Sequence, residues 1–397
     1  MITSQQQETL FKKLHAFKIE TPSWGFANTG TRFGKFIQTA AATNTEEKLM
    51  DAGEVNKVTG CCPTVAVHVL WDFPKGLASV DDVQALAAKY GVRIGAINPN
   101  VFQDQCYKYG SLANPDPEIR RGALRHILDC IEIGKRTGSR DLSLWFTDGS
   151  SYPGTANIRA RRQWFIEGLR EAHQALSSGQ RMLVEYKPFE PAFYHTDIAD
   201  WGMSLLMSRA AGPQAKVLVD TGHHYHGQNI EQIVAWLLAE EMLGGFHFND
   251  RRYADDDLTM GCIDPYQVFR IFHEIAYYEW ETGKQPPIAY MIDQSHNLKE
   301  KIEETIQTVV AAQQFMLKAA LVDHAALAGY QQKCALIDAE ECLKAAFHAD
   351  VRPILKEWRK SRGLPEDPLA AYRASGYAEK ASAARASRNA SSGGSYA

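Results

Sequence analysis

Short apolar runs alternate with longer amphipathic segments along the first three quarters of the chain. The segments 116–136 and 229–242 show the spacing of surface helices, and Asp116 and Asn229 are suited to cap their first turns. Several of the apolar runs are hydrophobic almost throughout, which is typical of parallel strands covered by helices. Eight such runs, rich in β-branched and aromatic residues, occupy residues 19–26, 64–71, 93–100, 142–146, 182–188, 216–223, 244–250 and 289–296.

Eight strand–helix repeats predict an α/β fold, a closed (β/α)8 TIM barrel formed by residues 1–300. A doubly wound open sheet is the alternative, but no GxGxxG sequence follows the first strand, so a Rossmann fold has no support. Residues 301–375 are helical in pattern, and we expect them to form a C-terminal extension that contacts neighbouring subunits. Residues 376–397 are rich in Ala, Ser and Gly and have little to bury, so we expect them to be disordered.

Composition narrows the classes of partner. The 397 residues carry a formal charge of only -4, which argues against a nucleic-acid surface because such a surface needs a basic excess. No apolar run reaches the ~20 residues of a membrane span, and the N-terminus lacks the apolar region of a secretory signal. The seven cysteines show no CxxC spacing and are expected to be reduced thiols. We therefore expect a cytoplasmic protein that binds neither nucleic acid nor a membrane.

Ionisable residues interrupt four consecutive predicted strands, namely Glu185, Asp220, His247 and Asp293. The carboxyl ends of barrel strands meet at one mouth, where active sites of this fold lie. Buried charges are costly unless they are paired or bind metal, and Lys187 is the one obvious inward-facing cation in these strands. Ion pairing would thus leave most of the negative charge uncompensated. The pattern favours a site for Mn²⁺ or Mg²⁺, with Co²⁺ and Zn²⁺ as alternatives.

A second acidic cluster, RRYADDDL, follows the seventh predicted strand. In an extended loop Asp255 and Asp257 would point to one side and Asp256 to the other. With His223 they could hold a second metal beside the first, although a DDD run in a loop is often only a solvated charge run. Two histidines close to His223 are expected to bind no metal. His224 is assigned to packing, and His226 to the loop before the next helix.

Several motifs together resemble a known family of sugar isomerases. VEYKPFEP (184–191) resembles the Glu-x-Lys-Pro-x-x-Pro strand of xylose isomerases, DTGH (220–223) their carboxylate-x-x-His ligands, and DDD (255–257) their Asp-x-Asp pair. With GTRFGKF (30–36), INPN (97–100) and the helical C-terminal region, nearly the whole chain is similar to bacterial L-rhamnose isomerases of the broad-specificity type. That family has a TIM barrel with a histidine in strand seven and an aspartate in strand eight.

The resemblance implies two divalent ions per subunit, with Mn²⁺ favoured. The ligands of the first ion would be Glu185, Asp220, His247 and Asp293. The ligands of the second ion would be His223, Asp255 and Asp257, with Asp220 as a bridge.

The resemblance also assigns roles to residues around the ions. Lys187 would contact O1 of the substrate and His68 would assist ring opening. Asp220 and His223 are also assigned as catalytic residues, because they would bind the ions that take part in the reaction. Xylose isomerases place an aspartate three residues after the ring-opening histidine. Here Asp72 stands four residues after His68, so the sequence does not decide whether the two form a couple.

Aromatic residues would complete the substrate site. The family implies that Trp145 and Trp24 form apolar walls and that Phe33 enters the site of a neighbouring subunit, so a homotetramer is expected. The expected substrate is a small sugar. The expected reaction interconverts L-rhamnose and L-rhamnulose, and related aldoses, by a metal-assisted hydride shift from C2 to C1. A carboxylate base and an enediol intermediate form the rival route.

Three other functions are compatible with this barrel. A sugar epimerase would use a single metal with two glutamates as acid and base, and a metal-dependent DNA-repair endonuclease would need more histidine ligands and a basic groove. A barrel that binds metal or sugar without catalysis has no feature to recommend it. The Asp255–Asp257 pair and Lys187 favour the isomerase.

Overall fold

The computed structural model describes residues 4–29, 36–189, 192–295 and 298–391. At its centre lie eight parallel strands. A parallel bridge between Glu20 and Met291 joins the first strand to the last, so the sheet curls into a barrel and the predicted TIM barrel is confirmed. The strands, in the order in which they pair, are β1 Thr21–Pro22, β2 Thr64–His68, β3 Arg93–Asn98, β4 Asp141–Leu144, β6 Arg181–Glu185, β8 Ala215–Asp220, β9 Leu243–Phe248 and β10 Ala289–Ile292.

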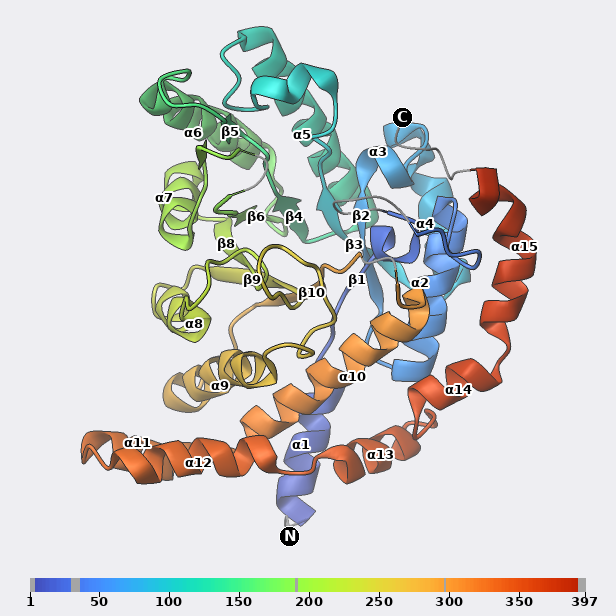
Figure 1. Cartoon of the computed structure of the whole chain (residues 1–397), viewed down its shortest axis with the longest axis vertical. Helices are drawn as coiled ribbons and strands as arrows, with labels where there is room; N and C mark the ends of the chain where they lie inside the picture. Colours follow the sequence, from blue (N-terminus) through green and yellow to red (C-terminus); the bar gives the residue numbers. More distant parts are fainter. Residues whose placement is uncertain (1–3, 30–35, 190–191, 296–297, 392–397) are drawn as a thin grey trace.

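A ring of helices surrounds the barrel (Figure 1). The expected caps are present, because Asp116 accepts the N–H of Glu118 and Asn229 accepts the N–H of Gln232. Within the described residues no helix has both the length and the hydropathy needed to cross a membrane. The helices that follow successive strands are α2 Thr45–Thr59, α4 Val80–Lys89, α5 Pro117–Thr137, α6 Ile158–Ala175, α7 Trp201–Ala211, α8 Ile230–Ala239, α9 Pro265–Thr282 and α10 Lys301–Ala320.

Two predicted strands are shorter than their apolar runs. The run 19–26 contributes only β1, because Pro22 has no N–H for the sheet and the chain turns into a 3-10 helix. The run 64–71 leaves the sheet after His68, whose N–H bonds the carboxylate of Asp72. The remaining short elements of the barrel region are α1 Ser4–Ala16, η1 Ser23–Phe26, α3 Val69–Asp72, η2 Gly76–Ser79, η3 Gln105–Tyr109, β5 Gly149–Ser150 and β7 His195–Thr196.

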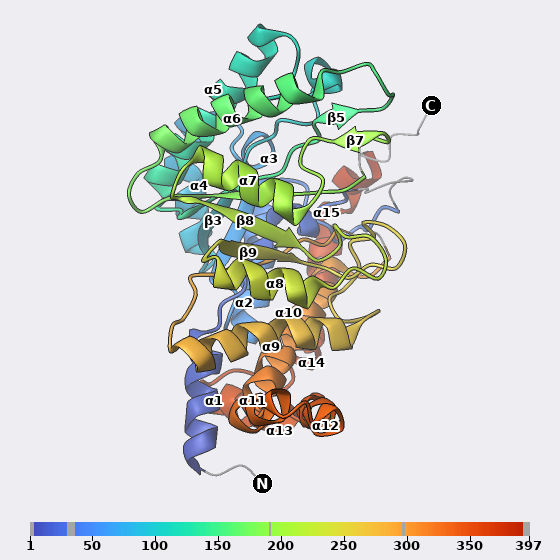
Figure 2. The same cartoon turned by 90° about the vertical axis from the view of Figure 1, so that its left-hand side faces the viewer.

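The C-terminal helices form an arc outside the barrel (Figure 1). α10 lies between α9 and α2 and completes the ring, so the extension begins with α11 and not at residue 301 as expected. Figure 2 shows that α15 lies on the side of the molecule toward which the strand arrows point. The helices of the arc are α11 His324–Gln332, α12 Leu336–His348, α13 Arg352–Ser361, α14 Pro368–Ala374 and α15 Tyr377–Ser391.

The disorder expected from residue 376 onward is wrong for the helix α15. Its low hydrophobicity is offset by buried polar contacts. Arg385, only 1% exposed, places Nη1 2.8 Å from Oδ2 of Asp51, and Tyr377 donates its hydroxyl to the other oxygen of the same carboxylate at 2.6 Å. A buried, bidentate Arg–carboxylate pair of this kind is among the strongest polar contacts in proteins.

The interior of the barrel is layered along each strand. Because side chains alternate between the two faces of a strand, Arg181, Leu183 and Glu185 of β6 all point inward at successive heights. The layer at the height of Leu183 is an apolar belt. The floor below it and the mouth above it are polar. The belt residues that cluster inside the barrel are Trp24, Ala66, Ala96, Leu183, Leu218, Ala289 and Met291.

Candidate metal centre

A cavity of about 280 Å³ opens at the carboxyl ends of the strands. Asp220, fully buried, lies beneath its surface. Phe33 falls outside the described residues, so its predicted place in a neighbouring site stays a prediction. The predicted site residues that line the cavity are Trp24, His68, Trp145, Glu185, Lys187, His223, His247, Asp255, Asp257 and Asp293.

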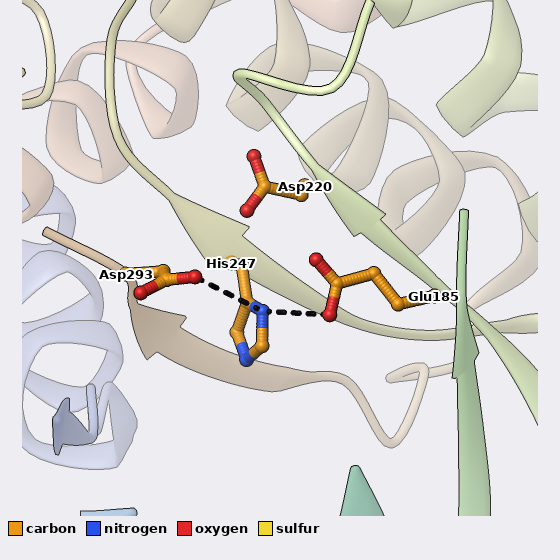
Figure 3. Close-up of side chains that lie close together, drawn as sticks. All are labelled: Glu185, Asp220, His247 and Asp293. Carbon is orange, nitrogen blue, oxygen red and sulfur yellow. Dashed lines mark ion pairs between the residues drawn. The ribbon is translucent and has the colours of Figure 1, made fainter. Parts of the chain in front are cut away.

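The first predicted ligand group converges at the mouth (Figure 3). One donor atom from each of Glu185, Asp220, His247 and Asp293 lies within 4.8 Å of the others. The ring Nδ1 of His247 is 3.2 Å from Oε2 of Glu185 and 3.8 Å from Oδ2 of Asp293. Each residue lies within one position of the carboxyl end of its strand, so the shape of the barrel itself brings the four together.

A second ligand group shares Asp220 with the first. Donor atoms of Asp220, His223 and Asp255 lie within 4.8 Å of one another. Nε2 of His223 is 3.8 Å from Oδ2 of Asp220 and 3.5 Å from Oδ2 of Asp255. The opposite ring nitrogen is 3.0 Å from the carbonyl oxygen of Tyr186, and such a contact fixes the orientation of a ligating imidazole.

Asp220 is held by one oxygen and leaves the other available. Its Oδ1 accepts the N–H of Gly222 at 2.7 Å and Nδ2 of Asn249 at 3.0 Å. Gly222 permits this approach, because a Cβ there would lie 2.6 Å from Oδ1 of Asn249. The sequence analysis did not identify Asn249 as a site residue. The one indication was its position directly after the strand that carries His247.

The carboxylates and histidines at the mouth shift one another's pKa values. Burial would raise the pKa of Glu185, but the neighbouring His247 and His223 outweigh burial and lower this pKa to about 2. Burial raises the pKa of Asp220 to about 7. Burial also disfavours charge on His247, yet Glu185 and Asp293 raise its pKa to about 9. Without an ion, protons on the histidines therefore offset the carboxylate charge.

The donor set fits divalent cations. Oδ2 of Asp220 and Nε2 of His247 are buried and have no hydrogen-bond partner within the described part of the chain, while Nδ1 of His247 faces Glu185 at 3.2 Å. Such buried polar atoms are costly unless something binds them. Carboxylate oxygens with imidazole nitrogens suit Mn²⁺, Mg²⁺, Co²⁺ or Zn²⁺. The residues present thus fit two ions that share one carboxylate.

The DDD loop is not extended as expected. The carboxylate of Asp256 accepts the N–H groups of residues 252, 253 and 254, which folds the loop into a tight turn, and Asp257 has φ of 52°. Asp257 lines the cavity, but it is not among the donor atoms that lie within 4.8 Å in the groups found among the described residues. Burial and the neighbouring Asp255 raise the pKa of Asp257 well above its ordinary value.

Lys187 is placed between the acidic groups and the aromatic wall. Its Nζ is 2.6 Å from Oδ2 of Asp255 and 5.2 Å from the ring centre of Trp145. The side chain is 6% exposed and lines the cavity. A buried ammonium group at this point can donate to an oxygen of a bound molecule.

His68 and Asp72 do not form a side-chain couple. Asp72 binds Nζ of Lys48 at 2.7 Å and the hydroxyl of Ser23 at 2.6 Å, and it receives only the backbone N–H of His68. The imidazole of His68 lies between aromatic rings instead, with its centre 4.8 Å from that of Trp24. Burial lowers the pKa of His68 to about 3, so the ring is neutral.

The aromatic wall is larger than predicted. Trp71 and Phe102 also line the cavity, with ring centres 4.2 Å and 5.7 Å from that of His68. Gln103 joins them by accepting the indole N–H of Trp71 at 2.9 Å. Trp71 lies in the short helix α3 after β2 and Phe102 lies in the loop after β3, so the periodicity of the strands does not identify either as a site residue.

The two remaining histidines have the roles expected for them. His224 is 1% exposed and contacts the hydroxyl of Tyr186 at 2.7 Å through Nε2. His226 contacts the carbonyl oxygen of Arg252 and so links two loops. These contacts agree with a packing role for His224 and a loop role for His226, and the expectation that neither binds metal stays a prediction.

Comparisons with known proteins identify the family. The family model described as xylose isomerase-like TIM barrel matches residues 64–312, more than half of the chain, and the chain belongs to this family. A probable sugar isomerase of Rhizobium meliloti (strain 1021) is 40% identical over 381 residues, which cover 94% of this chain and 87% of that protein. A probable sugar isomerase of Mesorhizobium japonicum is 38% identical over 387 residues, covering 96% and 89% of the two chains.

Solved structures agree on the architecture. An L-ribulose 3-epimerase superposes with a TM-score of 0.57 at 11% identity and covers 81% of this chain and 98% of its own. At this identity the likeness shows the fold alone. The class is therefore a sugar isomerase- or epimerase-like TIM barrel, whose mouth carries an acidic cluster that could bind metal.

Proposed function

We propose that this protein is an aldose–ketose isomerase that interconverts L-rhamnose and L-rhamnulose, and related sugars. The reaction would depend on two divalent ions per subunit, and Mn²⁺ is the favoured metal. The observation that carries the proposal is the pair of ligand groups that share Asp220, with Lys187 in the same cavity. The names of the two close relatives, both probable sugar isomerases, support the same reaction class.

The residues of the cavity divide the work of such a reaction. Divalent ions at this site would act as Lewis acids and lower the pKa of bound water. Lys187 would donate to the O1 oxygen and stabilise negative charge that develops there. Trp24 and Trp145 would cover the apolar side of the sugar and exclude water, while neutral His68 would exchange a proton during ring opening.

The epimerase alternative is less well supported by the site. Acid–base epimerisation with a single metal uses two glutamates, whereas within the described residues Glu185 is the one glutamate that lines the cavity.

The proposal also includes a homotetramer in which Phe33 enters a neighbouring site, and a cytoplasmic location.

The decisive experiment removes bound metal with EDTA, restores Mn²⁺ and follows L-rhamnulose formation from L-rhamnose. We expect no turnover after chelation and full turnover after Mn²⁺ is restored, with Asp220→Asn inactive throughout. Conversion of one ketose into another without any aldose would instead indicate an epimerase. Running the reaction in D₂O separates the routes, because deuterium in the product carbon would contradict the hydride shift.

A further inference from the structure

Helix α15 donates hydrogen bonds to the backbone of residues 39–41, an irregular segment that precedes helix α2. Asn389 donates through Nδ2 to the carbonyl oxygens of Thr39 at 3.0 Å and Ala41 at 2.9 Å. Arg385 donates through Nη1 to the carbonyl oxygen between them, that of Ala40, at 2.7 Å. Backbone carbonyls that are not in a helix or sheet need other partners, and here the C-terminal helix provides them.

The same asparagine also contacts the wall itself. Oδ1 of Asn389 accepts Nδ2 of Asn28 at 2.8 Å. Asn28 is paired in turn with the backbone of Gln38, whose N–H it accepts and whose carbonyl oxygen it bonds, both at 3.0 Å. The next residue, Thr29, lines the cavity and donates its hydroxyl to the carbonyl oxygen of Trp24 at 3.2 Å.

This chain of contacts ends at a candidate metal ligand. The indole N–H of Trp24 donates to Oδ1 of Asp293 at 2.9 Å. A bridge between Ala27 and Ala42 fixes the backbone on either side of the network. Asn389 is therefore linked to the wall that faces the proposed substrate by hydrogen bonds and by the backbone that joins Asn28 to Thr29.

Anchoring of α15 does not depend on Asn389. Arg385 binds the carboxylate of Asp51 through both terminal nitrogens, at 2.8 Å and 2.9 Å, and Tyr377 binds the same carboxylate at 2.6 Å. The helix should therefore stay docked when Asn389 is replaced. Replacing Asn389 should therefore affect mainly Asn28 and residues 39–41, which its side chain contacts. The effect of Asn389 on substrate binding can then be measured separately from its effect on stability.

We infer that Asn389 is a positioning residue, which acts through Asn28 to hold residues 27–29 in the shape that the substrate requires. The inference rests on the proposed function, because the substrate is taken to be the sugar bound in that cavity. Asn389 touches no substrate. Among its contacts with the described residues, its amide donates to two carbonyl oxygens and accepts from the amide of Asn28, and the residue is 1% exposed.

The test compares Asn389→Ala and Asn389→Asp with Ser387→Ala, an exposed position of the same helix. In Asn389→Asp a carboxylate oxygen replaces the amide and faces two carbonyl oxygens. We expect KM for L-rhamnose to rise about 3- to 10-fold at saturating Mn²⁺, with kcat changed by less than about 2-fold, since ground-state positioning is lost while the ligand groups stay in place. Hydrogen exchange should become faster in residues 21–29 and 36–44, and Ser387→Ala should match the wild type.

Two outcomes would overturn the inference. One is unchanged exchange and unchanged KM in both variants. The other is a lower melting temperature with unchanged KM, which would leave Asn389 a purely stabilising residue. If Asn389→Asp does not fold, Asn28→Ala tests the same link from the other side, and combining it with Asn389→Ala should add little to either change alone.

Failure of the proposed function would look different. A metal-loaded wild type without isomerase activity on any aldose would contradict that function. Hydrogen exchange in the Asn389 variants would then still decide whether this residue fixes residues 27–29, because faster exchange supports the positioning and unchanged exchange overturns it.

Discussion

On β6, Arg181 and Glu185 point into the barrel at its two ends, and the two regions they occupy compensate charge differently. At the floor, Arg181 pairs with Asp141 and donates to the carbonyl oxygens of Pro287 at 2.5 Å and Gly244 at 2.9 Å. At the mouth, Glu185 faces other acidic groups and two histidines, and Oδ2 of Asp220 is a buried atom with no hydrogen-bond partner among the described residues.

The difference separates structural charge from functional charge. The cation at the floor is supplied by the chain, so its carboxylate is satisfied as soon as the protein folds. At the mouth, protons on His223 and His247 offset the carboxylate charge when no cation is bound, and Oδ2 of Asp220 has no hydrogen-bond partner among the described residues, as expected for a site that binds a cation. The first expectation is therefore that substitutions at the mouth abolish activity and substitutions at the floor reduce stability.

The largest effect is expected for Asp220→Asn, because this carboxylate belongs to both ligand groups. We expect kcat/KM to fall by at least about 10³-fold, and Glu185→Gln to behave similarly, with the barrel still folded. Steady-state kinetics and circular dichroism measure the two properties. The matched control is Asp141→Asn at the floor, which should keep its activity. Normal turnover in Asp220→Asn would remove the basis for the metal centre.

The floor should respond in the opposite way. Arg181→Met leaves the largely buried carboxylate of Asp141 with only the exposed Arg140 as a charged partner among the described residues, and it removes the Arg181 donor from two carbonyl oxygens. We expect the free energy of unfolding to fall by about 3–5 kcal/mol, measured by urea denaturation. Arg140→Met removes an exposed partner of the same carboxylate and should cost less than about 1 kcal/mol. Equal losses in the two variants would show that the buried pair is not what stabilises the floor.

Metal binding should stabilise the protein only when the mouth is intact. With Mn²⁺ at 100 times its dissociation constant, linkage predicts a gain of about 2.7 kcal/mol for each ion. We expect EDTA to lower the melting temperature of the wild type and of Arg181→Met, but to have little effect on Asp220→Asn. A shift of equal size in all three proteins would place the stabilising ion elsewhere.

The smallest effect concerns pH and Glu20, a floor carboxylate that accepts the N–H of Ala96 at 2.8 Å. Burial raises the pKa of Glu20 to about 7, above the value of about 4.3 for an unfolded chain. The folded protein therefore binds an extra proton between these values. This stabilising contribution is complete below about pH 4 and is lost as pH rises through about 7.

The measurement compares the wild type with Glu20→Gln, which cannot ionise. Between pH 5 and pH 8 we expect the wild type to lose about 1–3 kcal/mol of unfolding free energy relative to the variant. Parallel pH profiles for the two proteins would contradict a raised pKa at this position.

The strands and the mouth were predictable because both follow from local pattern. Alternation along a strand and convergence of strand ends are enough to bring Glu185, Asp220, His247 and Asp293 together. The DDD loop was not predictable in this way. Its shape is set by the hydrogen bonds of one side chain, Asp256, to its own backbone.

The helix α15 shows a second limit of sequence reasoning. Its composition is that of a disordered tail, and its order depends on Arg385 meeting Asp51, more than 300 residues earlier in the chain. The aromatic wall around Trp71 and Phe102 is a similar case, since these rings meet only when the short helix α3 and the loop after β3 lie side by side. Contacts between such distant, irregular segments leave no periodic signal.

The apolar belt has a consequence for protein engineering. Four residue steps along the strand, roughly 13 Å, separate Arg181 from Glu185, so the salt bridges of the floor share no direct contact with the residues of the mouth. Directed evolution could therefore exchange the residues at the strand ends, and with them the chemistry, without refitting the salt bridges beneath. In such a barrel the catalytic residues at the mouth and the stabilising salt bridges at the floor can be mutated independently of each other.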